Sequence, residues 1–175
     1  MTARVAAFAF FLAFTTMSTF AQVQKKDVPG VTNYSRVDAT IGCGGATTPA
    51  AMTELKKEGY RSVINLRLES EPGADIAASR AAAEAAGLKY IHLPFNAAAP
   101  DSTVVDRFLA TVADTRNQPV FIHCGSANRV GGVWLIKRVL QDHWTIERAR
   151  AEADAIGLRD PKLVAFASEY IATHQ

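Results

Sequence analysis

The sequence predicts one α/β domain with three layers, in which helices cover both faces of a mostly parallel central sheet. Three observations predict this fold class. Short apolar segments at residues 60–66, 88–93 and 120–122 alternate with segments of helical periodicity, as in chains built of strand–helix–strand units. Residues 60–66 show little alternation of apolar and polar side chains, which is typical of a strand buried on both faces of a parallel sheet. The 175 residues, of which 49% are hydrophobic and 21% charged, suit one globular domain.

The N-terminal segment differs in character from the rest of the chain. A basic residue precedes an apolar run at residues 5–14 that is too short to span a bilayer, and small residues surround a cleavage point after Ala21. An uncleaved N-terminal anchor is the alternative. The pattern predicts export to the periplasm or the extracellular space. The expected divisions are a signal peptide at 1–21, a flexible leader at 22–32 and the α/β domain at 33–175.

Composition excludes several classes of partner. The formal net charge is +2, and no basic run with interleaved aromatic residues occurs, so we expect no nucleic-acid partner. No later segment has the length of a membrane span, so we expect no membrane contact once the signal is removed. The four histidines show no metal-ligand spacing, and no Gly-rich nucleotide motif is present. We therefore expect neither a metal nor a cofactor, and the oligomeric state stays open.

The first half of the domain is expected to alternate strands and helices. Residues 33–37 and 39–41 are strand candidates, and residues 41–45, Ile-Gly-Cys-Gly-Gly, are expected to form a flexible turn. Thr48, followed by proline, has the pattern of an N-cap and predicts a helix up to Gly59. The strand at 60–66, an alanine-rich helix at 74–86 ended by Gly87, and a strand at 88–93 follow.

The second half is expected to hold four helices and one strand. Residues 104–114 have one apolar face, as an amphipathic helix does, and precede the strand at 120–122. The helix expected at 130–140 is apolar almost all round, which indicates a central helix with Trp134 in the core. Two capped helices complete the chain, at 146–156 after Thr145 and at 161–173 after Asp160.

A strand, a tight loop and a helix N-terminus follow one another at residues 119–136. Such a turn points several backbone N–H groups and the positive end of a helix dipole at one place, which favours an anion. Cys124 stands at the mouth of the loop, where we expect it to ionise to a nucleophilic thiolate. Arg129 closes the loop with a planar fork that suits two oxygens of an oxyanion. The candidate anion-binding residues are Gly125, Ser126, Ala127, Asn128 and Val130.

These residues resemble the cysteine-dependent phosphatases of the protein tyrosine phosphatase superfamily, in their dual-specificity-like branch. His123 before the cysteine, the Val-Gly-Gly segment after Arg129 and the segment Ile64-Asn-Leu-Arg67 are most similar to two bacterial groups. One is the phosphatase-like domain of beta-lactamase-hydrolase-like proteins, and the other is the phosphatase-like domain fused to some NAD kinases. The likeness extends from about Tyr34 to the C-terminus. Four residues separate Cys124 from Arg129, whereas dual-specificity-like phosphatases have five and rhodanese sulfurtransferases have four.

The resemblance implies hydrolysis of a phosphate monoester, on a phosphorylated protein or a small anionic substrate, through a phosphocysteine at Cys124. Two alternatives stay open: a rhodanese-like sulfurtransferase that forms a Cys124 persulfide, and an inactive anion-binding module. The phosphatases usually have Ser or Thr after the arginine, where this chain has Val130. Their general-acid position falls near Asn96, so Asp101 is the only candidate acid of that loop, although it also suits an N-cap.

Four further residues are expected to support the site. By the resemblance, His123 tunes the thiolate through hydrogen bonds of the loop, and Arg67 lies beside the anion. An ion pair between Arg67 and Glu71 is the alternative, and Glu71 could instead orient Arg129. Cys43 could form a disulfide with Cys124 or protect it as a resolving thiol, because no other cysteine is present.

Overall fold

The computed structural model describes residues 23–175, so the predicted signal peptide lies outside the described residues. Over that part of the chain a sheet of six strands has the order β1-β2-β3-β6-β4-β5. The four strands β3, β6, β4 and β5 are parallel, and β1 and β2 extend one edge in antiparallel pairing. The strands are β1 (Gln24–Lys25), β2 (Ser35–Arg36), β3 (Ile41–Gly44), β4 (Ser62–Asn65), β5 (Lys89–His92) and β6 (Val120–His123).

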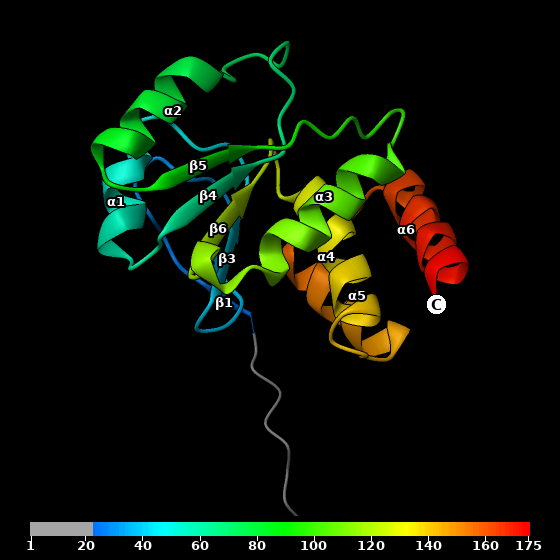
Figure 1. Ribbon diagram of the computed structural model, residues 1–175. Coiled ribbons are helices and arrows are strands. Elements are labelled where there is room, and N and C mark those ends of the chain that lie inside the picture. The colour runs from blue at the N-terminus through cyan, green and yellow to red at the C-terminus, as the bar shows by residue number, and fades with distance from the viewer. Residues whose placement is uncertain (1–22) are drawn as a thin grey trace, which may run out of the picture.

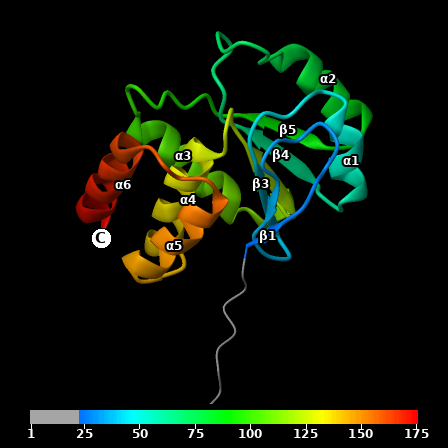
Figure 2. The ribbon, with the colours of Figure 1, turned by 180° about the vertical axis from the view of Figure 1, so that it is seen from behind.

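Helices cover both faces of this sheet, so the predicted three-layer α/β class is confirmed (Figure 1). One layer holds α1 (Ala51–Lys57) and α2 (Ile76–Ala85). The other holds α3 (Ser102–Ala113), α4 (Asn128–Leu140), α5 (Ile146–Ile156) and α6 (Pro161–His174), and a short 3-10 helix at Thr115–Asn117 leads into β6. The view from behind shows the same separation of the two helical layers (Figure 2).

The two faces of β6 contribute to two separate apolar cores, because successive side chains of a strand point to opposite sides. Ile122 and Cys124 join the larger core beneath α3 to α6. Phe121 joins the smaller core beneath α1 and α2, where it stacks on Tyr34 at 5.9 Å between ring centroids. The catalytic cysteine of the sequence prediction therefore belongs to the side of the sheet that α4 covers.

Helix α4 is the central helix that its apolar sequence predicts. Nine of its residues are buried, and Trp134 is fully buried in the larger core, as expected. The helix packs against α5 and α6, and Gly131 permits this contact, since a Cβ there would lie 2.8 Å from the Leu158 side chain. The N-terminus of α4 is thereby fixed against the end of β6.

Two expectations for the beginning of the domain do not match the structure. Thr48 does not cap the first helix, because Ala50 lies at the N-cap position of α1 and no side chain caps it. The segment expected as a leader holds strand β1 and the buried Val28, and its flexibility stays a prediction. The expected flexible turn at 41–45 is strand β3 over Ile41–Gly44. Its glycines provide space for packing, since a Cβ on Gly42 would lie 1.8 Å from the Tyr60 hydroxyl.

Candidate active site

The loop between β6 and α4 lies at the carboxyl edge of the parallel strands, where open α/β sheets bind ligands. Strand β6 has β3 on one side and β4 on the other. The backbone N–H of Cys124 donates to the carbonyl of Gly44 at 3.3 Å, and the N–H of Leu66 donates to the carbonyl of His123 at 2.9 Å. Both neighbouring strands thus fix the start of the loop.

Two carbonyl groups of the loop point to its outer side, away from the place expected for the anion. The Gly125 carbonyl accepts from the N–H of Ala46 at 2.9 Å, and the Ser126 carbonyl accepts from the side-chain amide of Asn33 at 3.4 Å. In a trans peptide the N–H points opposite to the carbonyl. The N–H groups of Ser126 and Ala127 therefore point to the inner side, and neither has an acceptor within residues 23–175.

The residue at the turn into α4 has a left-handed backbone. Ala127 has φ 71° and ψ 0° and is fully buried, although this conformation favours glycine. Asn128 begins the helix, and its side-chain oxygen accepts from the N–H groups of Arg159 and Asp160 at 2.9 and 3.2 Å. Asn128 therefore ties the start of α4 to the segment between α5 and α6.

Arg129 is held by one edge of its guanidinium group. Its Nη1 donates to the carbonyl oxygens of Leu66 and Phe95, each at 3.1 Å, and to Oε1 of Glu71 at 2.5 Å. Its Nη2 donates to Oε2 of Glu71 at 2.8 Å. Within residues 23–175 the Nε–H and the second hydrogen of Nη2 donate to no oxygen, and the guanidinium group contacts the Cys124 thiol.

Charge and burial act in opposite directions on this ion pair. Burial alone would lower the pKa of Arg129, but the hydrogen bond to Glu71 and the charge at Cys124 raise it above its ordinary value. Burial alone would raise the pKa of Glu71, but Arg129 and the N–H of Leu68 lower it to about 2. The pair is therefore fully ionised at neutral pH.

Arg67 also binds Glu71, and it supports the loop that carries this glutamate. Its Nε donates to Oε2 of Glu71 at 3.2 Å, and its two terminal nitrogens donate to the carbonyls of Pro72 and Gly73 at 2.6 and 3.0 Å. The predicted ion pair with Glu71 is present, and the Arg67 side chain is only 8% exposed. Its donors shape the loop that holds Glu71 and do not face the Cys124 loop.

His123 is a neutral histidine inside the smaller core. Burial lowers its pKa to about 3, and its ring stacks on Phe121 at 6.0 Å. Within residues 23–175 neither ring nitrogen has a hydrogen-bond partner, although the backbone groups of Cys124 and Gly45 lie beside the ring. The structure therefore places His123 next to the loop backbone and on the opposite face of the strand from the Cys124 thiol.

The loop after β5 provides no free carboxylic acid. The Asp101 carboxylate accepts from the N–H and the hydroxyl of Thr103 at 2.9 and 2.8 Å, and thereby caps α3. The N-cap prediction for Asp101 is confirmed. The Asn96 side chain accepts from the N–H of Ala98 at 3.0 Å. Glu71 is the carboxylate that contacts Arg129, and its low pKa makes it unable to hold a proton for a leaving group.

The two cysteines are free thiols on the same face of the sheet. Cys43 pairs with Ile122, two residues before Cys124. Regular parallel strands would place the two Cα atoms roughly 8 Å apart, beyond the usual limit of about 7 Å for a disulfide. Burial raises the pKa of Cys43 well above its ordinary value, so its thiol stays protonated.

Sequence reasoning missed three groups that shape this site: the Asn33 amide, the Ala46 N–H and the Phe95 carbonyl. Each reaches the loop from a segment far away in the sequence, since 93 residues separate Asn33 from Ser126. Asn33 has φ 49°, but asparagine alone is a weak indication of such a backbone. No local pattern therefore identified these contacts.

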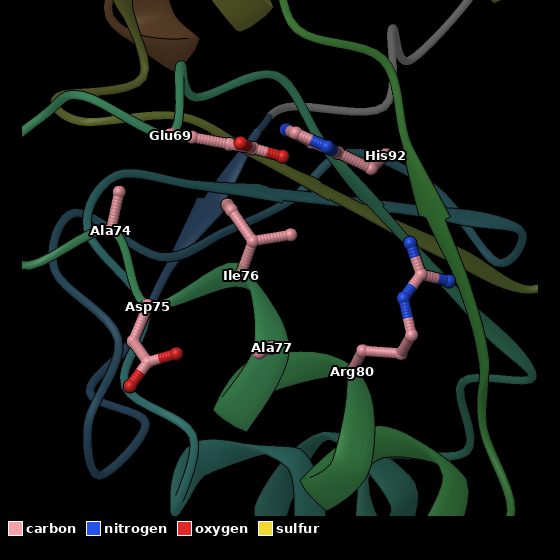
Figure 3. Close-up of a pocket in the computed structure, with 7 residues that line it drawn as sticks. All are labelled: Glu69, Ala74, Asp75, Ile76, Ala77, Arg80 and His92. Atoms are coloured by element: carbon pink, nitrogen blue, oxygen red, sulfur yellow. The ribbon is translucent and has the colours of Figure 1, made fainter.

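A separate pocket of about 570 Å³ lies beside the loop that carries Glu71 (Figure 3). The Glu69 and His92 side chains lie at one end of it, and Arg80 reaches in from α2 (Figure 3). Nε2 of His92, the last residue of β5, lies 2.8 Å from the Arg67 carbonyl. The pocket is lined by Glu69, Ala74, Asp75, Ile76, Ala77, Arg80 and His92.

Comparison with known proteins decides the family. The model of one family, the phosphatase-like domain of beta-lactamase hydrolase-like protein, matches residues 35–141. This chain belongs to that family. The match contains β6, the Cys124 loop and all of α4. The resemblance stated from the sequence is thereby confirmed, together with the class that the family's description gives, a phosphatase-like hydrolase.

Curated relatives of this phosphatase-like domain are longer proteins. Beta-lactamase hydrolase-like proteins of two Xylella fastidiosa strains, Temecula1 and 9a5c, are each 28% identical over 125 residues. The matched part is 69% of this chain and 27% of each relative. The chain thus spans about a quarter of the length of the curated relatives it matches.

Solved structures share the fold of the phosphatase-like domain. A DUF442 protein from Shewanella putrefaciens CN-32 has a TM-score of 0.72 at 21% identity, covering 83% of this chain and 95% of that one. TpbA from P. aeruginosa has a TM-score of 0.67 at 23% identity, covering 90% and 92%. The catalytic core of the PP-IP phosphatase SIW14 from S. cerevisiae, in complex with citrate, has a TM-score of 0.65 at 20% identity, covering 85% and 89%.

Two further features describe residues 23–175. Among them no three His, Cys, Asp or Glu residues cluster closely enough to hold a metal ion. Their helices all fall short of the length and apolar character needed to cross a membrane.

Proposed function

We propose that this phosphatase-like domain hydrolyses phosphate monoesters through a phosphocysteine at Cys124. The observation that carries the proposal is the convergence of donors on one thiol. The N–H groups of Ser126 and Ala127 point into the loop, and the guanidinium group of Arg129 lies beside the Cys124 thiol. Such fixed donors stabilise the equatorial oxygens of a phosphoryl group in its transition state.

The reaction has two steps at this site. The Cys124 thiolate attacks phosphorus, the S–P bond forms as the P–O bond to the leaving group breaks, and the leaving oxygen takes a proton from solvent. Water then attacks phosphorus, the S–P bond breaks, and phosphate and the thiolate are released. Val130 follows Arg129 and has no hydroxyl, so its side chain cannot assist thiolate departure.

The shortage of acids in the site favours substrates with good leaving groups. Asp101 caps α3, and Glu71 is ionised in its pair with Arg129. Leaving groups of low basicity need little protonation, so aryl phosphates should react much faster than alkyl phosphates. A phosphotyrosine-like ester fits this requirement, and a TpbA structure was solved in complex with phosphotyrosine.

Sulfur transfer is the second candidate, and the four-residue spacing from Cys124 to Arg129 favours it. When the thiolate attacks the outer sulfur of thiosulfate, the S–S bond of a Cys124 persulfide forms as the S–S bond of thiosulfate breaks, and sulfite leaves without needing an acid. The family's description as phosphatase-like supports phosphate hydrolysis over this alternative.

The proposed location is the periplasm or the extracellular space. It depends on the apolar run and the small residues before Gln22, outside the described residues. Amino-terminal sequencing of the exported protein would show a start at Gln22, and retention of Met1 would contradict the proposal.

The deciding experiment measures phosphate released from an aryl phosphate and thiocyanate formed from thiosulfate and cyanide by the same reduced protein. We expect phosphate release that Cys124→Ser reduces at least about 1,000-fold, since this change removes the nucleophile. Thermal unfolding of Cys124→Ser checks that the fold is retained. Full activity of Cys124→Ser would contradict the mechanism, and Cys124-dependent thiocyanate without phosphate would establish the sulfurtransferase instead.

A further inference from the structure

Strand β1 reaches the Cys124 loop through two polar side chains. The ammonium group of Lys25 donates to Oδ1 of Asn33 at 2.7 Å, to the Ser35 hydroxyl at 2.6 Å and to the carbonyl of Ile156 at 3.2 Å. Nδ2 of Asn33 then donates to the carbonyls of Ile156 and Ser126 at 3.1 and 3.4 Å. Lys25 is thus linked, through the Asn33 side chain, to the loop of residues 124–129, which we call the anion loop.

The lysine and two carbonyls together determine which way the Asn33 amide faces. An ammonium group has only donors, so it must face the amide oxygen and not the amide nitrogen. The NH₂ group then faces the two carbonyls, which can only accept. Without Lys25 nothing else among residues 23–175 donates to Oδ1 of Asn33, and the orientation of the amide then depends on the two carbonyls alone.

The amide of Asn33 acts on the catalytic loop through one peptide unit. By holding the Ser126 carbonyl outward, it turns the N–H of Ala127 inward, toward the place where the oxyanion would lie. Ala127 has a left-handed backbone, which residues other than glycine disfavour. Local backbone preference therefore does not fix the orientation of the Ser126–Ala127 peptide. Gly157 permits the approach, since a Cβ there would lie 3.0 Å from Nδ2 of Asn33.

We propose that Lys25 and Asn33 are positioning residues of the active site, which set the direction of the Ala127 N–H without touching the substrate. The inference rests on the proposed function, because it assigns these residues to the anion loop of that reaction. It also makes strand β1 a part of the active-site structure.

The test measures tungstate binding by calorimetry and aryl phosphate hydrolysis for Lys25→Met and Asn33→Gly. Glycine accepts the positive φ of Asn33, so that variant removes the amide without backbone strain. Lys26→Met is the matched control, because Lys26 pairs with Glu58 and has no contact with the loop. We expect about 10-fold weaker tungstate binding and a similar loss in kcat/KM for both variants, and no change for the control.

The double variant separates this role from a general loss of stability. If Lys25 acts through Asn33, Lys25→Met should add no further loss of tungstate affinity in the Asn33→Gly background. Wild-type tungstate affinity in both single variants would overturn the proposal, as would equal losses in Lys26→Met. Wild-type protein that binds tungstate but releases no phosphate would contradict the proposed reaction alone, and the tungstate series would still decide the role of Lys25.

Discussion

At the scale of single residues, the site depends on how each side chain is fixed by its partners. Arg129 has one edge occupied by Glu71 and two carbonyls, which leaves the other edge for an anion. The bidentate contact fixes a planar fork that would otherwise rotate about several bonds. Glu71 therefore contributes to anion binding without contacting the anion.

Replacing Glu71 by glutamine should lower kcat/KM for an aryl phosphate by about 10- to 100-fold, because a neutral amide holds the Arg129 fork less firmly. The measurement compares Glu71→Gln with Glu69→Gln, a change of the same kind in the same loop. Glu69 is exposed and forms no ion pair within the described residues. Equal rates for wild type and Glu71→Gln would show that Arg129 needs no such partner.

Cys43 should be dispensable for turnover, because its thiol is buried, protonated and out of disulfide range in this conformation. Cys43→Ala should keep wild-type kcat/KM under reducing conditions. Peroxide treatment followed by mass spectrometry of the intact protein should show oxygen added at Cys124 and no mass loss of two hydrogens. A Cys43–Cys124 disulfide in that experiment would contradict this prediction and would show that Cys43 acts as a resolving thiol.

At the scale of elements, glycines allow strands and helices to approach their neighbours closely. Strand β3 approaches Tyr60 through Gly42, and the hydroxyl of Tyr60 in turn lies 2.6 Å from that of Tyr34. This contact holds β3 against the smaller core. The Gly44 carbonyl in β3 accepts from the N–H of Cys124, so the position of β3 also fixes the start of the anion loop.

Gly42→Ala should destabilise the protein by about 1–3 kcal/mol, since the added methyl group overlaps the Tyr60 hydroxyl in a packed core. Urea unfolding measures the change. Gly59→Ala serves as the comparison, because Gly59 has φ 90° and a Cβ added there would meet no atom within 4 Å. Only backbone strain of about 1 kcal/mol is therefore expected. A smaller loss at Gly42 than at Gly59 would contradict the packing argument.

At the scale of the whole molecule, the buried His123 and the partly buried Glu71 make stability depend on pH in the same direction. The pKa of His123 is about 3 in the folded protein, below its ordinary 6.5, so the folded state favours the neutral ring. This contribution is complete above pH 6.5 and is lost as the pH falls toward 3. Glu71 has a pKa of about 2 against an ordinary 4.5, so its contribution is lost between those values.

The free energy of unfolding should therefore fall steadily from pH 7 to pH 4, with a limiting slope of about 1.4 kcal/mol per pH unit for each group that titrates. Urea titrations at several pH values measure it. Glu71→Gln should reduce the slope below pH 4.5 to the part that His123 contributes, and His123→Gln should remove the slope between pH 6.5 and 4.5. Stability that rises on acidification from pH 7 to pH 5 would contradict both assignments.

The sequence by itself determined the fold class, most helices and the identity of the central loop. Caps at Thr145 and Asp160, the buried run of β4 and the apolar α4 are local patterns, and each is found where it was expected. Asp101 as a cap belongs to the same group. Local patterns suffice for these elements, because hydrophobic period and capping act within a few residues.

The tertiary structure decided the partners of the loop and the pairing of the N-terminal segment. Strand β1 has two residues, too few to show any period, and it forms by pairing with β2. Glu71 meets Arg129 across 58 residues, and Asn33 meets Ser126 across 93. No spacing rule connects such segments, because the sheet order that brings them together is set by the packing of the whole domain.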